Sequence, residues 1–330
     1  MRLTHEPLPL ETVFEFRIAH RGARLGHENV LVRLEHEGVT GFGEAAPSHY
    51  YGESRALVET ALETWRGALG EDPFALEAIF ARMEAILQGN RAAHAAIDSA
   101  LHDWIGKRLA LPVWKWLGLD PARTPLSSVT LGLAAPGEME RKLETVADFP
   151  ILKIKLGAPG DVESLRLVRS RYRGVIRVDA NAAWNAADAV RVLRRIEPFE
   201  IELVEQPVAR EDLDGLRWVR ERVGIPVFAD ESVHRLGDIA NLAGRVDGVN
   251  LKLMKTGGLR EMLRMIHAAR AHGLQIMLGS MVESSLALSA AVGCGTARSA
   301  RRPPRSRRSL AAAPRSFRRR AGGARPHHAR

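Results

Sequence analysis

Five charged residues recur at nearly constant spacing in the second half of this 330-residue chain. The steps between them are 24, 26, 25 and 22 residues, and the residues are Lys155, Asp179, Glu205, Asp230 and Lys252. Each ends a short aliphatic run, and an amphipathic stretch follows it. A repeat of about 25 residues matches one strand, one loop, one helix and one loop. Such units close into a (β/α) barrel, whose strand C-termini meet at one mouth.

The three carboxylates in this series predict a metal site. Asp179, Glu205 and Asp230 end successive repeats, so their oxygens are expected to converge. Three hard oxygen ligands, with room for substrate and water, suit Mg²⁺ or Mn²⁺ better than zinc. The alternative is that each carboxylate caps the following helix, but three in consecutive repeats favour a metal. Neighbouring residues expected to support the ligands, with plain loop roles as the alternative, are Asn181, Gln206 and Glu231.

Lysines lie on both sides of the carboxylates in the series. Lys153 and Lys155 are two apart in one strand, so both are expected to point inward. Crowded ammonium groups oppose each other's charge, which lowers a lysine pKa toward the ~7–8 that suits a general base. One lysine can remove a proton α to a metal-held carboxylate, and Lys252 can return a proton to the opposite face. Lys255 is expected in a loop and is the weaker candidate for this second base. Snorkelling strand-end lysines are the alternative.

Two polar segments of the first half are expected to cover the site as flaps. They are HRGARLGHEN (20–29) and SHYYGES (48–54). The predicted substrate contacts, with surface roles as the alternative for the first two, are Arg24, Tyr50, Ser280, Met281 and Glu283.

The pattern along the chain predicts an α/β protein with three parts. Residues 1–122 are expected to form an α+β capping domain, with strands in 3–47, a turn region at 38–47 and helices in 55–118. Residues 123–293 are expected to form the barrel, and 294–330 a disordered Arg-rich tail. Seven barrel strands are countable and an eighth is not; they lie at 126–133, 151–157, 175–181, 201–207, 227–232, 249–254 and 275–280.

The net charge of +9 comes from the C-terminal segment. Residues 294–330 hold 12 arginines and no acid, which leaves 36 basic and 39 acidic side chains before them. The body is therefore not expected to bind nucleic acid. Three interpretations of the tail compete: a natural basic tail, a nucleic-acid-binding arm, or out-of-frame translation of GC-rich DNA, which we favour because the change interrupts a helical pattern.

Composition also bounds the location of the protein. No run of 18 apolar residues exists, and residues 1–16 lack the pattern of a signal peptide. A single cysteine, Cys294, excludes an intramolecular disulfide framework. We therefore expect a cytoplasmic protein without a membrane partner. The sequence is compatible with either a monomer or a homo-oligomer.

The motifs around the charged residues resemble those of the enolase superfamily, in its muconate-lactonising subgroup. The segments are KIK (153–155), DAN (179–181), EQP (205–207), DES (230–232) and NLKLMKTGG (250–258). GFGEAAPSHYYGES, NLKLMKTGG and GSMVESSLALSAA are most similar to dipeptide epimerases of the L-Ala-D/L-Glu type. The resemblance covers residues 3–293. It implies a capping domain over a modified (β/α)₇β barrel of the TIM type, one Mg²⁺ per subunit, and Lys155 and Lys252 as the acid/base pair, with Lys153 tuning Lys155.

The implied activity is an isomerase reaction that removes and returns the α-proton of a dipeptide through an enediolate. Other reactions of the subgroup are alternatives, namely N-acylamino acid racemisation, o-succinylbenzoate synthesis and muconate cycloisomerisation. Dipeptide epimerases are expected to carry Asp-x-Asp on the last strand, and none follows Met281 in this sequence. We accordingly expect the last strand to be missing and the activity to be impaired. The alternative from a different class is an inactive product whose basic tail binds nucleic acid.

Overall fold

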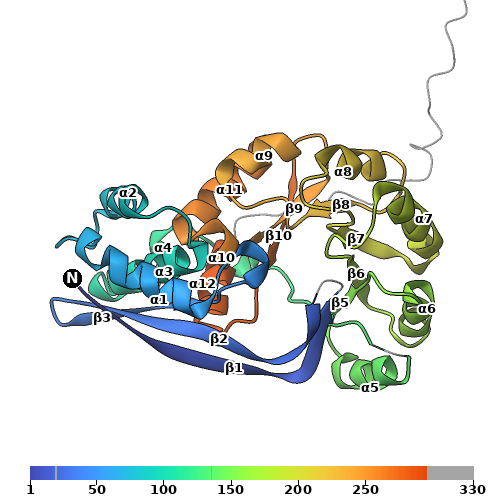
Figure 1. Ribbon diagram of the computed structural model, residues 1–330, viewed down its shortest axis with the longest axis horizontal. Helices are drawn as coiled ribbons and strands as arrows, with labels where there is room; N and C mark the ends of the chain where they lie inside the picture. Colours follow the sequence, from blue (N-terminus) through green and yellow to red (C-terminus); the bar gives the residue numbers. More distant parts are fainter. Residues whose placement is uncertain (19–20, 135, 296–330) are drawn as a thin grey trace, which may run out of the picture.

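The computed structural model describes residues 1–18, 21–134 and 136–295, with the side chains at 13–25, 136 and 293–295 outside the described part. It contains a three-stranded antiparallel sheet and a seven-stranded parallel sheet. Figure 1 shows helices against one face of the first sheet and helices around the outside of the second. The Arg-rich segment lies outside the described residues from position 296 onward.

The first sheet has the order β1-β2-β3, and its helices follow it in the chain. Its strands are β1 (Arg2–Ile18), β2 (Arg21–His36) and β3 (Val39–Ala45). The helices are η1 (His49–Tyr51), α1 (Arg55–Trp65), η2 (Arg66–Ala68), α2 (Leu76–Ile86), α3 (Arg91–Arg108), α4 (Val113–Trp116) and η3 (Pro121–Arg123). This architecture has the antiparallel sheet and the helices that the sequence predicts for the N-terminal half. The boundary at residue 122 stays a prediction.

Two expectations for the N-terminal half are wrong. The predicted turn region at 38–47 contains strand β3, because its glycines allow a helix to approach the sheet closely. A Cβ on Gly43 would lie 1.9 Å from the carbonyl oxygen of Ala96, and one on Gly41 would lie 2.0 Å from that of Ala100. The predicted flap at 20–29 is strand from Arg21 onward, since pairing with β1 satisfies its backbone groups.

The second sheet has the order β10-β9-β8-β7-β6-β5-β4, and each strand is parallel to its neighbours. Its strands are β4 (Val129–Leu131), β5 (Ile151–Lys155), β6 (Val175–Asp179), β7 (Ile201–Glu205), β8 (Val227–Ala229), β9 (Gly248–Lys252) and β10 (Gln275–Gly279). The helices are α5 (Pro136–Val146), α6 (Asp161–Arg171), α7 (Ala186–Ile196), η4 (Glu197–Phe199), α8 (Leu213–Arg220), α9 (Leu236–Leu242), α10 (Leu253–Thr256), α11 (Leu259–Ala271) and α12 (Ser285–Gly295).

This curled sheet confirms the predicted α/β fold class, a (β/α) barrel architecture with seven parallel strands in the described residues. All seven predicted strands are present, and β4 and β10 form the two edges of the sheet. Within the described residues, no further strand joins these two edges. Buried aliphatic side chains fill the space between the strands and the surrounding helices, for example Ile154, Val178 and Leu251.

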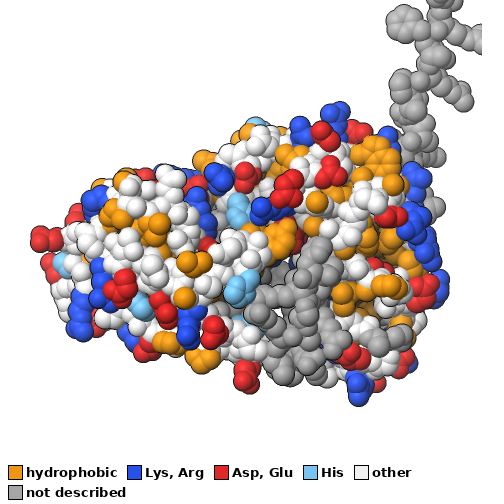
Figure 2. Space-filling view, viewed as in Figure 1, with side chains coloured by type: hydrophobic (Ala, Val, Ile, Leu, Met, Phe, Trp, Pro, Cys, Tyr) orange, Lys and Arg blue, Asp and Glu red, His pale blue; other side chains and the backbone are white. Residues whose placement is uncertain are grey.

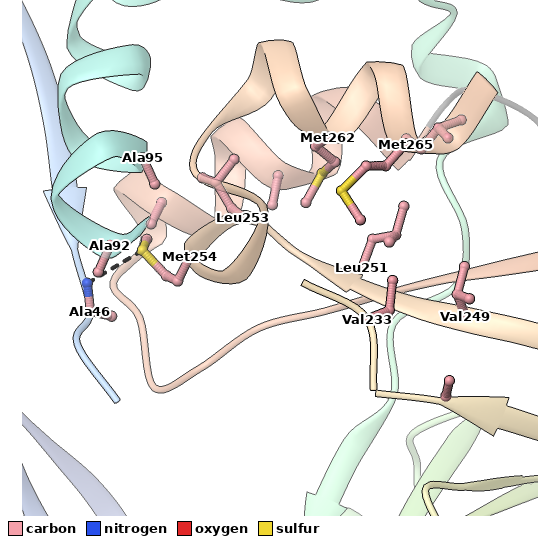
Figure 3. Close-up of a cluster of buried hydrophobic side chains, with 14 of the residues drawn as sticks. Ala46, Ala92, Ala95, Val233, Val249, Leu251, Leu253, Met254, Met262 and Met265 are labelled. Atoms are coloured by element: carbon pink, nitrogen blue, oxygen red, sulfur yellow. Dashed lines mark hydrogen bonds between the residues drawn. The ribbon is translucent and has the colours of Figure 1, made fainter. Parts of the chain in front are cut away.

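The one-turn helix α10 packs between the two halves of the structure. Leu253 and Met254 are buried there, and Figure 3 shows Met254 directed toward Ala46, Ala92 and Ala95. The backbone N–H of Ala46, at the end of β3, donates to the Met254 sulfur at 3.3 Å. The segment that follows β9 is therefore packed against both the first sheet and helix α3 of the N-terminal half.

The surface of the described part of the chain carries both signs of charge. On the face shown in Figure 2, lysine and arginine side chains are interspersed with aspartate and glutamate. Among the described helices, none has both the length and the apolar character needed to cross a membrane.

Close packing of β3 on α3 predicts the effect of a single added methyl group. Gly43→Ala is expected to lower the free energy of unfolding by about 1–3 kcal/mol, because its Cβ would overlap backbone that has no room to move. The matched control is Gly67→Ala, whose Cβ would meet nothing within 4 Å. Thermal unfolding of both variants tests this, and equal melting temperatures for Gly43→Ala and the unaltered chain would contradict the packing argument.

Candidate active site

The three predicted metal ligands converge at the C-terminal ends of the parallel strands. Asp179, Glu205 and Asp230 each offer one carboxylate oxygen, and these oxygens lie within 4.8 Å of one another. The first two side chains are fully buried, and Asp230 is 1% exposed. Three buried carboxylates at this spacing need compensating positive charge, because each is costly to remove from water alone.

Strand register explains why the carboxylates meet. Lys155 pairs with Asp179 across β5 and β6, and Asp179 pairs with Glu205 across β6 and β7. Asp230 directly follows β8, and Lys252 is the last residue of β9. Because neighbouring parallel strands are in step, residues that end them lie side by side at one edge.

Four buried lysines surround the carboxylates. Lys155 Nζ lies 2.7 Å from Asp179 Oδ2, at one end of the row. Lys252 Nζ lies 2.7 Å from Asp230 Oδ2, at the other end. Lys153, two residues before Lys155, lies between Asp179 and Glu205, with Nζ 2.8 Å and 2.7 Å from an oxygen of each. The fourth is Lys255, which contacts Asp230.

Burial and charge shift the pKa values of these groups in different directions. Burial lowers the pKa of Lys155; Asp179 opposes this shift and Lys153 adds to it. Burial also lowers the pKa of Lys153, but the charges of Asp179 and Glu205 outweigh burial, so the pKa of Lys153 is raised overall. Burial, together with the charge of Asp179, raises the pKa of Glu205 to about 8. In the metal-free protein the three carboxylates therefore do not all ionise readily at neutral pH.

This donor set fits a hard divalent cation. The site offers three carboxylate oxygens and no cysteine or histidine, which favours Mg²⁺ or Mn²⁺ over zinc. The additional positive charge would also favour the ionised form of Glu205. The residues that would hold the ion are Asp179, Glu205 and Asp230.

Polar neighbours predicted to support the ligands lie at the site and bond within it. Asn181 Oδ1 accepts from Lys155 Nζ at 2.7 Å, and Asn181 Nδ2 donates to Glu231 Oε1 at 2.9 Å. Gln206 Oε1 accepts from the backbone N–H of Asp230 at 2.9 Å. Asn181 and Gln206 both adopt left-handed backbone conformations, with φ of 45° and 36°. Strain of this kind persists where the surrounding structure fixes it.

The predicted substrate contacts occupy different positions around the site. Tyr50 lies in η1 and is 42% exposed. Ser280 and Met281 follow β10, and the backbone N–H of Met281 donates to Glu283 Oε1 at 2.7 Å. Burial of its carboxyl group, with the charge of Glu44, raises the pKa of Glu283 to about 7. Arg24 lies in β2, but its side chain is outside the described part of the chain.

Lys255 does not lie in a loop, as the sequence had suggested. It belongs to helix α10, and it is 1% exposed. A single helical turn is too short to give a periodic pattern, and the following Gly257, at φ 88°, ends it. The sequence carries no local signal for this position, because the burial of Met254 and Thr256 on either side of the lysine is visible only in the structure.

Two contacts near the site were missed because they join distant parts of the chain. The ring of Tyr51 meets that of His234 edge-on, with centroids 4.1 Å apart. Glu44 of β3 accepts hydrogen bonds from Asn29 and from the backbone and hydroxyl of Ser284. The one signal for Glu44 in the sequence is that a charged residue stands near the end of an otherwise uncharged strand.

Comparison with known families matches both halves of the chain. Residues 13–118 match the "Mandelate racemase / muconate lactonizing enzyme, N-terminal domain". Residues 138–318 match the "Enolase C-terminal domain-like" family. The chain therefore belongs to the mandelate racemase/muconate lactonizing enzyme family of the enolase superfamily, in the muconate-lactonising subgroup, which confirms the resemblance seen in the motifs.

Individual relatives within this family are dipeptide epimerases. The chain is 39% identical to the L-Ala-D/L-Glu epimerase of Bacteroides thetaiotaomicron over 293 residues, which cover 88% of this chain and 76% of that protein. It is 34% identical to the hydrophobic dipeptide epimerase of a Flavobacteria bacterium, over 88% and 85% of the two chains. A solved dipeptide epimerase from Enterococcus faecalis, complexed with Mg and L-Leu-L-Tyr, superposes with a TM-score of 0.85 at 33% identity, over 90% and 86% of the chains.

Substitution of a metal ligand is expected to lower the affinity of the protein for Mg²⁺ while the fold stays intact. Glu205→Gln is expected to weaken Mg²⁺ binding by at least about tenfold, as loss of even an outer partner of a ligand costs that much. The matched control is Glu202→Gln on the same strand, whose carboxylate pairs with Arg177. Calorimetric titration of metal-free protein measures the affinity, and circular dichroism verifies the fold. If Glu205→Gln and the unaltered chain bind Mg²⁺ with equal affinity, Glu205 is not a metal ligand.

Proposed function

We propose that this chain is a Mg²⁺-dependent epimerase that acts at the α-carbon of a dipeptide's C-terminal residue. The observation that carries the proposal is the placement of two buried amines at opposite ends of one carboxylate row. Lys155 lies at the Asp179 end and Lys252 at the Asp230 end. The relatives named as dipeptide epimerases support the substrate class, at 31–39% identity.

The chemistry follows from the positions of the residues. Bound Mg²⁺ supplies positive charge against the negative charge that develops on the substrate carboxylate when the α-proton leaves. Lys155, whose pKa burial lowers, takes the proton from one face of the α-carbon. Lys252 delivers a proton to the other face, and the two lysines exchange roles for the opposite enantiomer. Lys153 stays between two carboxylates and acts on Lys155 through its charge.

We assign the remaining residues by their positions around this centre. Asn181 holds Lys155, Gln206 holds Asp230, and Glu231 holds Asn181 through hydrogen bonds. Substrate contacts are assigned to Tyr50, Ser280, Met281 and Glu283, and to Arg24 from the sequence alone. We also propose a cytoplasmic location, which the single cysteine supports. Assembly into a homo-oligomer is compatible with this proposal and can be tested separately.

A second candidate function is racemisation of an N-acylated amino acid on the same machinery. It is favoured by similarity to a solved N-succinyl Arg/Lys racemase from Bacillus cereus, with a TM-score of 0.84 and 30% identity over 90% of this chain and 85% of that one. This reaction also needs a proton removed from one face of an α-carbon and returned to the other. The two functions differ in what the substrate presents beyond its carboxylate.

Incorporation of deuterium from D₂O distinguishes these functions. Protein with Mg²⁺ is incubated with a panel of dipeptides and a panel of N-acylamino acids, and α-deuterium is measured by mass spectrometry. We expect exchange in at least one dipeptide, with the opposite stereoisomer formed. Exchange confined to N-acylamino acids would favour the second function, and no exchange in either panel would contradict both.

The two-base arrangement predicts distinct effects of two substitutions. Lys155→Ala and Lys252→Ala are each expected to reduce epimerisation by about 10²–10⁴-fold, the contribution typical of a positioned acid or base. Each variant should retain exchange only with the enantiomer whose proton faces the remaining lysine. Lys107→Ala in helix α3, which pairs with Asp103 away from the row, is the control. Normal epimerisation by Lys252→Ala would show that another group is the second base.

A further inference from the structure

We propose that Lys255 is a positioning residue whose ammonium group holds Asp230 in place as a metal ligand and leaves Lys252 free for proton transfer. This inference rests on the proposed function, because it assigns Lys255 a task in the same site. Lys255 does not reach the substrate side itself; it acts through Asp230.

The contacts of Lys255 use all its hydrogen-bonding capacity. Its Nζ donates to Asp230 Oδ1, to the Asp230 carbonyl oxygen at 2.6 Å and to the Asn250 carbonyl oxygen at 3.0 Å. A neutral amine has two N–H donors, whereas an ammonium group has three. Three acceptors around one buried nitrogen therefore match the three donors of an ammonium group, so that no N–H of Lys255 is left for another partner.

Lys252 contacts the same carboxylate in a different way. Its Nζ donates to Asp230 Oδ2 at 2.7 Å, and the residue is 9% exposed where Lys255 is 1% exposed. Because Lys255 occupies Oδ1, Lys252 is left with the second oxygen of the pair. Oδ2 is then the oxygen available to a cation, and Lys252 is the lysine that can be released for chemistry.

The position of Lys255 is fixed by packing from both domains. It lies in α10, between buried Met254 and Thr256. Figure 3 shows Leu253 and Met254 of this turn between the capping-domain residues and the helix that carries Met262 and Met265. A one-turn helix held on both sides gives its lysine little freedom, so Lys255 suits an anchoring role better than a mobile one.

Asp230 is also held from the opposite side. Its backbone N–H donates to Gln206 Oε1, which follows β7, while its carbonyl oxygen accepts from Lys255, which follows β9. The Asp230 backbone and one carboxylate oxygen are therefore fixed from the strands on either side of β8. A ligand that follows a strand of three residues gains its orientation from these neighbours.

Substitution of the two lysines by methionine separates anchoring from charge. If Lys255 acted only through its positive charge, Lys255→Met would make the site more negative and tighten Mg²⁺ binding. If Lys255 positions Asp230, the same change should weaken Mg²⁺ binding by about tenfold or more. Lys252→Met should abolish epimerisation while metal affinity is unchanged or higher, because it removes an ammonium group from Oδ2. Lys142→Met, at a buried lysine paired with Glu138 in α5, controls for the loss of any buried lysine.

The readouts are Mg²⁺ affinity by calorimetry, melting temperature of the metal-free protein, and epimerisation at rising Mg²⁺. Excess Mg²⁺ should restore epimerisation to Lys255→Met but not to Lys252→Met. If Lys255→Met does not fold, Lys255→Gln, which keeps an N–H donor on a shorter side chain, gives the same comparison. Equal or tighter Mg²⁺ binding by the folded variant would overturn the proposal. Weaker binding by the variant, with no exchange by the unaltered chain on any substrate, would support the anchor and contradict the proposed function.

Discussion

The structure depends on compensation of buried negative charge at the mouth of the barrel. Asp179, Glu205 and Asp230 lie together out of water, and buried lysines are bonded to them from both ends and from between. Breaking such a group by removing one partner leaves an unpaired buried charge, which costs several kcal/mol. The same concentration of charge that makes the site costly also makes it suitable for a divalent cation and for proton transfer.

The fold supplies this arrangement through strand register and close contact between domains. Parallel strands in step put the end of each repeat beside the next, so Lys155, Asp179 and Glu205 are direct neighbours. Contacts with the N-terminal half then fix the segments that follow the strands. Met254 of α10 packs against Ala46, which follows β3, and Glu44 of β3 bonds to Ser284, so the segments after β9 and β10 are both tied to the β3 region. Precise loop placement matters because small displacements in an active site are costly to catalysis.

Sequence reasoning was strongest where one residue type recurs with the strand–helix period. That regularity correctly predicted the seven parallel strands and the cluster of three acids, whereas the family was predicted from the resemblance of the motifs around these residues. It failed where long-range packing decides the conformation. Gly41 and Gly43 suggested a turn but allow α3 to approach β3, and Lys255 suggested a loop although it lies in a helical turn between two domains. No local sequence pattern predicts the contact of Tyr51 with His234, because 183 positions separate the two residues in the chain. The roles of the individual site residues stay predictions.

The account makes one central claim: two amines act on opposite faces of a carbon held beside a metal. Crystals grown with Mn²⁺ and a dipeptide product test it most directly, because anomalous scattering locates the ion. We predict the ion between Asp179, Glu205 and Asp230, with the α-carbon between Lys155 and Lys252. An ion bound elsewhere, or both amines on the same face of the α-carbon, would contradict the account.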